Sequence, residues 1–153
     1  MIKIAFVDMD GVLADDSHRK WLLDGIQNMT ERTRAHYYDM YHSRMVFDFP
    51  IESNVEMVCD LSKKFKIVIA TGRPEWYRDE TKEQLTRWGI DYYGIVMRPS
   101  DFKKSSVELK EGYAKQFIEV GYEISIAIDD RDDICDMYEK LNIKTMRIKN
   151  GKQ

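Results

Sequence analysis

The sequence contains little cysteine, little proline and no long apolar stretch. Its 153 residues include three prolines and two cysteines, Cys59 and Cys135. Two isolated cysteines do not form the disulfide framework of a small secreted domain, so we expect a protein of a reducing compartment, the cytoplasm. No apolar run approaches the roughly 20 residues that span a bilayer. Because the first residues lead directly into a strand pattern, we expect neither a signal peptide nor contact with a membrane.

The sequence also lacks an excess of positive charge. It has 24 Lys and Arg against 27 Asp and Glu, which gives a formal net charge of −3. Binding to long duplex DNA depends on neutralising many phosphates, so we expect no extended duplex binding. A local basic site for a nucleotide or a strand end is compatible with this balance. The pattern GxxxxGK followed by Ser or Thr is absent, so the chain has no P-loop. Nothing in the composition defines the oligomeric state.

Short apolar runs alternate with amphipathic segments along the chain. The apolar runs lie at 2–7, 67–70, 95–97, 124–128 and 145–148. Continuous runs of this kind are typical of strands covered on both faces, as in parallel sheets. Helical patterns lie at 52–65, 77–88, 106–120 and 132–141. We therefore predict an α/β fold over 1–153, a single domain with a Rossmann-like parallel sheet and helices on both faces.

Residues 16–50 interrupt this alternation. They directly follow the first strand, and their pattern indicates two helices, at about 17–28 and 30–44. Aromatic residues and methionines are dense in the second part: Tyr37, Tyr38, Met40, Tyr41, Met45, Phe47 and Phe49. An insertion at this point of the chain is expected to form a small helical cap over the end of the first strand.

Carboxylates and other polar residues follow three of the predicted strands. Asp8 and Asp10 end the first run and precede Gly11, Thr71-Gly72-Arg73 ends the second, and Asp129-Asp130 ends the fourth. Open α/β sheets bind ligands at the carboxyl ends of their strands. Two carboxylates beside a glycine turn suit a divalent cation and a phosphate. Taken singly, these motifs also have structural explanations, namely a solvated turn for the first and helix N-caps for the other two.

The order of these motifs resembles that of the haloacid dehalogenase (HAD) superfamily of phosphotransferases. Asp8-x-Asp10-Gly-Val is similar to its first motif, Thr71 to its second and Asp129-Asp130 to its fourth. A lysine at a helix start resembles the third. We assign this lysine to Lys110, at the start of the predicted 106–120 helix; a solvated surface lysine is the structural alternative there. Lys103 and Lys104 are the other candidates for the third motif. The resemblance covers essentially the whole chain and implies the HAD fold.

Two branches of the superfamily are similar to this sequence. One is the phosphatase domain of the bacteriophage-type polynucleotide kinase/3′-phosphatase, which it resembles at Arg19, 71–81, 97–99 and 128–131. The other is the 5′(3′)-deoxyribonucleotidase branch, whose opening resembles 7–15. The sequence departs from the first branch at 105–106, where two serines stand in the stretch that commonly carries an acidic residue before the lysine.

The resemblance implies a Mg²⁺-dependent phosphatase with an aspartyl-phosphate intermediate. Asp8 would attack phosphorus, and Asp10 would protonate the leaving oxygen and then activate water. The first of these proton transfers predicts a raised pKa for Asp10. The Mg²⁺ ligands would be the Asp8 side chain, the Asp10 backbone carbonyl and a carboxylate of Asp129 or Asp130.

The same resemblance implies a set of phosphate contacts. Thr71 and the Gly72 N–H would hold the non-bridging oxygens, and Lys110 would neutralise the charge of the phosphoryl group. Three arginines are candidate substrate contacts: Arg19, Arg73 and Arg98.

We therefore predict a phosphatase that acts on a nucleic-acid 3′-phosphate or on a nucleotide. A 5′(3′)-nucleotidase is the alternative, and a non-catalytic HAD-fold protein that binds a nucleotide or a partner is a further one. The three histidines, His18, His36 and His42, are not expected to bind a metal. For the aromatic residues at 37–49, and for Trp76 and Tyr77, packing and stacking on a nucleobase both stay open.

Overall fold

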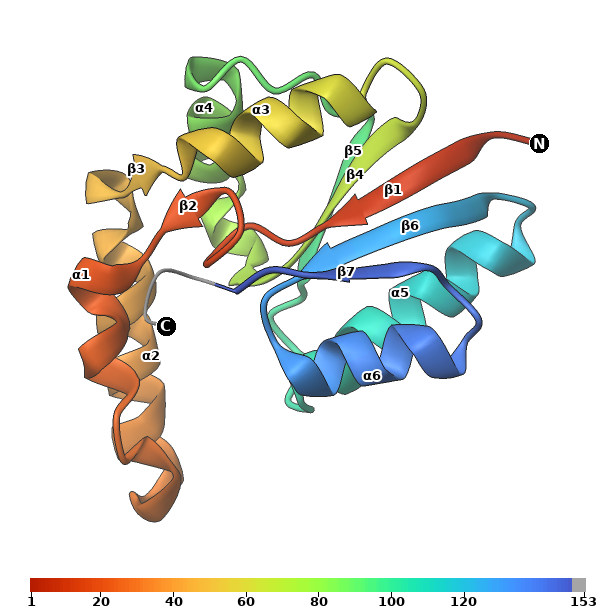
Figure 1. The fold of residues 1–153 in the computed structure, drawn as a ribbon. Helices are drawn as coiled ribbons and strands as arrows, with labels where there is room; N and C mark the ends of the chain where they lie inside the picture. The colour runs from red at the N-terminus through yellow and green to blue at the C-terminus, as the bar shows by residue number, and fades with distance from the viewer. Residues whose placement is uncertain (150–153) are drawn as a thin grey trace.

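A parallel sheet with strand order β5-β4-β1-β6-β7 forms the centre of the fold (Figure 1). The protein is represented here by a computed structural model, which describes residues 1–149. The strands are β1 (Lys3–Val7), β4 (Lys66–Pro74), β5 (Gly94–Arg98), β6 (Glu123–Asp129) and β7 (Thr145–Arg147). Each neighbouring pair runs parallel, which confirms the predicted α/β sheet. β1 lies in the middle because its apolar residues are buried on both faces.

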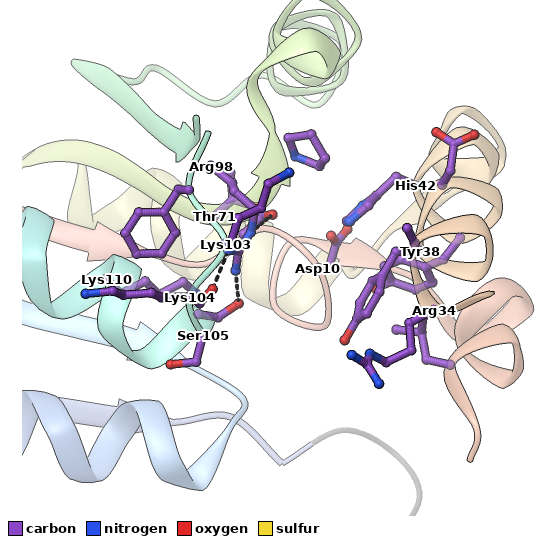
Figure 2. A pocket seen from close by; sticks show the side chains of 18 of the residues that line it. Asp10, Arg34, Tyr38, His42, Thr71, Arg98, Lys103, Lys104, Ser105 and Lys110 are labelled. Carbon is purple, nitrogen blue, oxygen red and sulfur yellow. Dashed lines mark hydrogen bonds between the residues drawn. The ribbon is translucent and has the colours of Figure 1, made fainter. Parts of the chain in front are cut away.

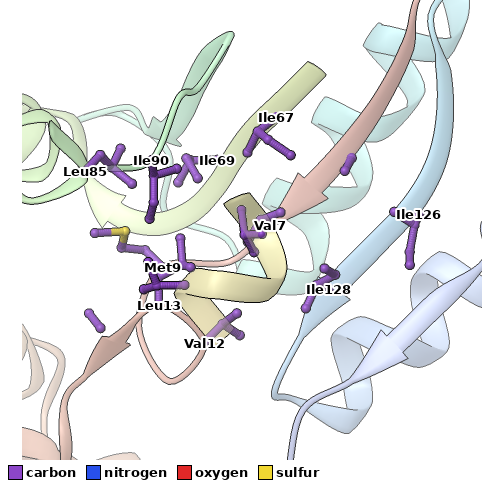
Figure 3. Packing of buried hydrophobic residues seen from close by; sticks show 14 residues of the cluster. Val7, Met9, Val12, Leu13, Ile67, Ile69, Leu85, Ile90, Ile126 and Ile128 are labelled. Atoms are coloured by element: carbon purple, nitrogen blue, oxygen red, sulfur yellow. The ribbon is translucent and has the colours of Figure 1, made fainter. Parts of the chain in front are cut away.

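Helices cover both faces of this sheet (Figure 1). Their bounds are α3 Glu52–Leu61 and α4 Arg78–Arg87 on one face, and α5 Ser106–Glu119 and α6 Asp132–Lys140 on the other. Alternate side chains of β1 point to opposite faces. Ala5 and Val7 belong to the core cluster shared with α3 and α4, drawn in Figure 3, whereas Ile4 and Phe6 pack with α5 and α6. Burying one such side chain fully contributes about 1.5–3 kcal/mol.

The insertion forms a cap on a short two-stranded stalk. β2 (Ala14–Asp15) and β3 (Phe49–Pro50) pair antiparallel, so the chain leaves and re-enters the main body at one point. The elements between them are α1 (Ser17–Lys20), η1 (Trp21–Leu23), η2 (Ile26–Asn28), α2 (Glu31–Ser43) and η3 (Arg44–Phe47). Figure 1 shows α1 and α2 beyond the carboxyl end of β1, away from the other helices.

The prediction of a continuous helix at 17–28 is wrong. The segment is one short helix followed by two 3₁₀ turns, because Asp24 is extended and Gly25 adopts a left-handed φ of 71°. The predicted helix at 30–44 matches α2, where the Thr30 side chain caps the first turn by accepting from the Thr33 N–H at 3.3 Å. Among the residues described, no helix combines the length and apolar character needed to cross a bilayer.

Candidate active site

The carboxyl ends of β1, β4 and β6 meet at one edge of the sheet, below the cap. A cavity of about 740 Å³ lies between this edge and the cap. Asp8, Asp10, Thr71 and Lys110 all line it. Figure 2 shows the cavity between a wall from the main body and a wall from α2. The topology therefore brings together motifs that lie far apart in the sequence.

A tight turn after β1 sets the positions of the first two carboxylates. Gly11 has a left-handed φ of 85°, which glycine adopts without steric cost. The N–H groups of Leu13 and Ala14 both donate to the Met9 carbonyl at 2.9 Å, so the turn closes on itself. The chain thereby reverses directly after Asp10 and leads into the stalk of the cap.

Lys110 joins two of the predicted acidic motifs. Its Nζ donates to Asp8 Oδ1 at 2.9 Å and to Asp129 Oδ2 at 2.7 Å. The side chain is buried, and although burial disfavours its charge, Asp129 and Asp8 raise the pKa of Lys110 well above its ordinary value. These two carboxylates therefore favour the charged form of Lys110. The geometry favours Lys110 as the third-motif lysine over Lys103 and Lys104, which are exposed on the rim.

A capping box places Lys110 in the first turns of α5. The Ser105 Oγ accepts from the Glu108 N–H at 3.2 Å, and the Glu108 carboxylate accepts from the Ser105 N–H at 3.4 Å. Ser105 thus has a local structural role that an acidic residue could also fill. The neighbouring Ser106 packs against Gly72, where an added Cβ would lie 3.0 Å from the Ser106 Oγ.

Asp8, Asp129 and Asp130 form a compact acidic group. One carboxylate oxygen from each lies within 4.8 Å of the others. Burial and the charge of Asp129 raise the pKa of Asp8 well above its usual value, although Lys110 opposes the shift, and they raise that of Asp130 to about 6. Such mutual repulsion is what a divalent cation relieves, so this oxygen donor set fits Mg²⁺.

The two aspartates of the fourth motif differ in their surroundings. The oxygens of Asp129 accept from Lys110 and, at 3.1 Å, from the Arg131 N–H, and the residue is 0% exposed. Asp130 lines the cavity. The arrangement favours Asp130 as the direct metal ligand and Asp129 as the residue that orients Lys110.

Arg19 and Arg73 hold Asp10 and do not reach the cavity. Their NH2 groups donate to Asp10 Oδ1 at 2.6 and 2.8 Å. Both arginines are 0% exposed, and neither lines the cavity. The structure places both arginines on Asp10, and the expectation that they contact substrate stays a prediction. Buried guanidinium groups need hydrogen-bond acceptors inside the protein. Arg73 Nη1, for example, donates to Gln84 Oε1 at 2.7 Å.

The expectation of a raised pKa for Asp10 is also wrong. Burial alone would raise the pKa of this carboxyl, but the charges of Arg73 and Arg19 outweigh it and lower the pKa well below its ordinary value. The resting site therefore keeps Asp10 ionised. Asp10 is prepared to accept a proton before it can donate one.

Asp48 is a site residue that the sequence reasoning missed. Its Oδ1 accepts from Arg19 Nε at 2.9 Å and lies 2.6 Å from His18 Nε2, and its Oδ2 accepts from Arg19 at 2.6 Å and from Arg73 at 3.5 Å. The side chain is fully buried. Asp48 directly precedes β3, so this cluster ties the returning end of the cap to β4. The sequence signal that could have indicated Asp48 is its position as a single carboxylate between Phe47 and Phe49.

Thr71, Gly72 and Arg98 form the wall opposite the cap. Thr71 lies within β4, not at a helix N-cap, and its Oγ1 accepts from the Arg73 N–H at 3.1 Å. Arg98 donates to the Lys104 carbonyl at 2.6 Å and to Ser106 Oγ at 2.9 Å. Arg98 therefore holds the loop before α5 in place. All three residues line the cavity.

The aromatic residues of the cap separate into two groups. Tyr41 is buried, donates to Asp16 Oδ2 at 2.5 Å and lies with its ring 4.2 Å from the Arg19 guanidinium carbon. Phe47 and Phe49 are exposed away from the cavity. Tyr38 lines the cavity and is 45% exposed. Tyr41 also lines the cavity, but it is buried and held by Asp16 and Arg19, so Tyr38 presents the more exposed ring.

Lys110→Met is expected to lower kcat about 10²–10³-fold, because it removes the buried charge that would neutralise the phosphoryl group in the predicted reaction. Release of inorganic phosphate under saturating substrate measures this. Lys115→Met, at an exposed position of the same helix, is the matched control and is expected to match wild type. Retention of more than half of the wild-type kcat by Lys110→Met would exclude a role for this lysine in the chemical step.

Comparisons with known proteins agree with this geometry. A family model described as the polynucleotide kinase PNKP phosphatase domain matches residues 2–153. A search of curated proteins finds no significant match. Among solved structures, a chain of the Pnkp1/Rnl/Hen1 RNA repair complex is 23% identical with a TM-score of 0.70, over 100% of this chain and 44% of that one. The present chain thus spans less than half of that relative's length.

Smaller hydrolases share the fold over most of their own length. A haloacid dehalogenase-like hydrolase from Streptococcus pneumoniae is 15% identical with a TM-score of 0.70, covering 97% of this chain and 85% of that one. A predicted phosphatase from Clostridium acetobutylicum is 17% identical with a TM-score of 0.69, covering 96% and 84%. The predicted resemblance to HAD phosphatases is confirmed. The chain belongs to the polynucleotide kinase PNKP phosphatase domain family of the HAD superfamily and is a phosphatase.

Proposed function

We propose that this phosphatase hydrolyses phosphomonoesters at nucleic-acid 3′ ends, with Mg²⁺ and through an aspartyl-phosphate on Asp8. The observation that carries the chemistry is the position of Lys110, whose buried ammonium bridges Asp8 and Asp129 beside the cavity. A nucleophile, a positive charge and an acidic group for a cation meet there. Family membership supports the nucleic-acid end as the substrate.

In the first step, an Asp8 oxygen forms a bond to phosphorus while the bond to the leaving oxygen breaks. The Thr71 hydroxyl, the Gly72 N–H and Lys110 hold the non-bridging oxygens. The carboxylates of Asp8 and Asp130 and the Asp10 carbonyl would hold Mg²⁺, which would supply the positive charge that offsets repulsion between Asp8 and the phosphate. Water then attacks the same phosphorus and releases Asp8.

Asp10 moves the protons of both steps. Because Arg19 and Arg73 keep it ionised at rest, we propose that the proton for the leaving oxygen enters with the substrate as a phosphate monoanion and passes through Asp10 to that oxygen. Phosphate monoesters have a second pKa of about 6, so this form is present near neutral pH. The ionised Asp10 then accepts a proton from the attacking water.

A nucleoside monophosphate is the second candidate substrate. The cavity volume of about 740 Å³ favours it, since ligand sites for small molecules range over roughly 300–1,000 Å³. For the polynucleotide candidate, the relative in an RNA repair complex is consistent with an RNA end. Two free cysteines, one buried and one partly buried, are in keeping with our proposal of a reducing, cytoplasmic environment.

Removal of the metal is expected to abolish activity on every substrate. With excess EDTA, phosphate release from a 3′-phosphorylated oligonucleotide should fall below detection, and added Mg²⁺ should restore it, because the carboxylate group needs a counter-cation. Nucleoside 3′- and 5′-monophosphates are measured in parallel. A higher kcat/KM for the oligonucleotide supports the proposed substrate, and the reverse preference supports the nucleotidase. Full activity in EDTA would contradict the metal requirement.

A further inference from the structure

Three side chains of the cap helix α2 face the cavity in one row. Arg34, Tyr38 and His42 are spaced four residues apart, so they lie on the same side of the helix. All three line the cavity. Figure 2 shows them along α2, opposite the wall that carries Thr71, Arg98, Lys103 and Lys104. We call these three residues the α2 row.

The inner end of the α2 row is aromatic. His42 is buried, and its Nδ1 has no hydrogen-bond partner within residues 1–149. The Tyr38 ring stacks on it with 6.3 Å between ring centroids and an interplanar angle of 21°. His42 supports the Tyr38 ring from one side. Because Tyr38 is 45% exposed and lines the cavity, a ligand in the cavity can reach its ring. Such rings act as platforms on which a nucleobase stacks.

The outer end of the α2 row is cationic. One nitrogen of Arg34 donates to the Met29 carbonyl at 2.7 Å, which anchors the side chain, and Arg34 forms no ion pair in the described part of the chain. Lys103 and Lys104, across the cavity, likewise have no carboxylate partner within 4.0 Å among residues 1–149. In contrast, Lys110 in the depth of the cavity is paired twice. Glu31 and Asp39 of α2 also line the cavity, so the positive charge available to an external anion is local to Arg34, Lys103 and Lys104.

We propose that the α2 row binds the terminal nucleotide of a single-stranded 3′ end, with its base on Tyr38 and its 5′ phosphodiester at Arg34. The inference rests on the proposed function, because the terminal phosphate must lie at Asp8. Arg34 and His42 are about 12 Å apart along the helix axis at 1.5 Å per residue, so sugar, base and phosphodiester follow in order outward from the catalytic edge. Lys103 and Lys104 complete the phosphodiester contact from the opposite wall.

This arrangement selects a single strand. A terminal base can reach Tyr38 only when it leaves its own stack, which is cheapest in an unpaired end. It also selects an end over a free nucleotide, since a nucleoside 3′-monophosphate lacks the 5′ phosphodiester that Arg34 would bind. The α2 row would thus select a single-stranded end over a free nucleotide, a choice that the catalytic residues alone do not make.

The test compares three substrates: a 3′-phosphorylated tetranucleotide, a nucleoside 3′-monophosphate and glycerol 2-phosphate. For Arg34→Gln, the ratio of kcat/KM for the tetranucleotide to that for the mononucleotide is expected to fall about tenfold. For Tyr38→Leu, kcat/KM for both nucleotide substrates relative to glycerol 2-phosphate is expected to fall about tenfold, and Tyr38→Phe should restore it. Arg32→Gln, an exposed position of α2 outside the cavity, is the matched control and should leave all ratios as in wild type.

Unchanged ratios in Arg34→Gln and Tyr38→Leu would overturn the α2 row, while phosphate release by the wild type would still support the proposed chemistry. If the wild type releases no phosphate from any substrate with Mg²⁺, the proposed function fails instead. The row is then tested by anisotropy with the fluorescent tetranucleotide on the Asp8→Asn variant. There, Arg34→Gln should weaken binding about tenfold, and equal binding would overturn the inference.

Discussion

Asp8→Asn is expected to lower phosphate release by about four orders of magnitude or more, because it removes the nucleophile on which both steps depend. The stability of the folded protein should not decrease. Burial and the neighbouring carboxylates of Asp129 and Asp130 raise the pKa of Asp8, so ionising it at neutral pH costs folding free energy. An asparagine removes that cost, and its side-chain oxygen can still accept from Lys110.

The sign follows from the number of bound protons. An aspartate with a raised folded-state pKa binds more protons in the folded than in the unfolded state, so wild-type stability falls as pH rises past the ordinary aspartate pKa. Asp8→Asn lacks this loss, and its Tm at neutral pH should equal or exceed that of wild type by a few degrees, about 2–4 °C per kcal/mol. Calorimetry and a phosphate assay measure the two effects. Asp91→Asn, at an exposed position, should change neither. Residual activity above one-hundredth of wild type would place the nucleophile elsewhere.

Asp48→Asn is expected to lower both stability and activity. Asp48 is the second carboxylate of a buried cluster in which Arg19 and Arg73 share two aspartates. Removing one partner of buried charges costs about 3–5 kcal/mol, which corresponds to a fall in Tm of roughly 10 °C for a chain of this size. An asparagine also turns an amide donor toward guanidinium donors, so the shape is kept and the pairing is lost.

The loss of activity should follow from Asp10. With Asp48 neutral, Arg19 and Arg73 have only Asp10 as a carboxylate partner, and we expect its position and proton affinity to change. A decrease of about 10²-fold in kcat is in the range of general acid–base contributions. It should persist at temperatures where the variant is fully folded, as checked by circular dichroism. A Tm within 2 °C of wild type, with unchanged kcat, would show that the cluster contributes neither stability nor positioning.

The parallel sheet could be predicted because its information is local. Each buried strand appears as a continuous apolar run, and the polar residues that end β1, β4 and β6 follow directly in the sequence. Once the strands are parallel, their carboxyl ends share an edge, so Asp8, Thr71 and Asp129 had to meet. The insertion was also visible in the sequence, but the helix predicted at 17–28 is interrupted, because Gly25 adopts a left-handed φ.

The directions of the arginine side chains could not be predicted. Arg19 pairs with a carboxylate 29 residues away and Arg73 with one 63 residues away. Which acid lies within reach depends on how the cap returns through β3, and that geometry is absent from any local pattern. The pKa of Asp10 follows the same rule, since a buried carboxyl is raised or lowered according to the charges that folding brings beside it.

The same division applies to the candidate ligand surface. The sequence by itself determined the α/β class, the ordered acidic motifs and an aromatic insertion after the first strand, because apolar periodicity and strand ends are local features of the sequence. For the third-motif lysine it left Lys110, Lys103 and Lys104 as candidates. Only the tertiary structure decided that Tyr38 lines the cavity with an exposed ring, whereas Tyr41 lines it with a buried ring and Phe47 is exposed elsewhere. A helix presents a different face every few residues, and its orientation is set by packing with segments far away in the chain.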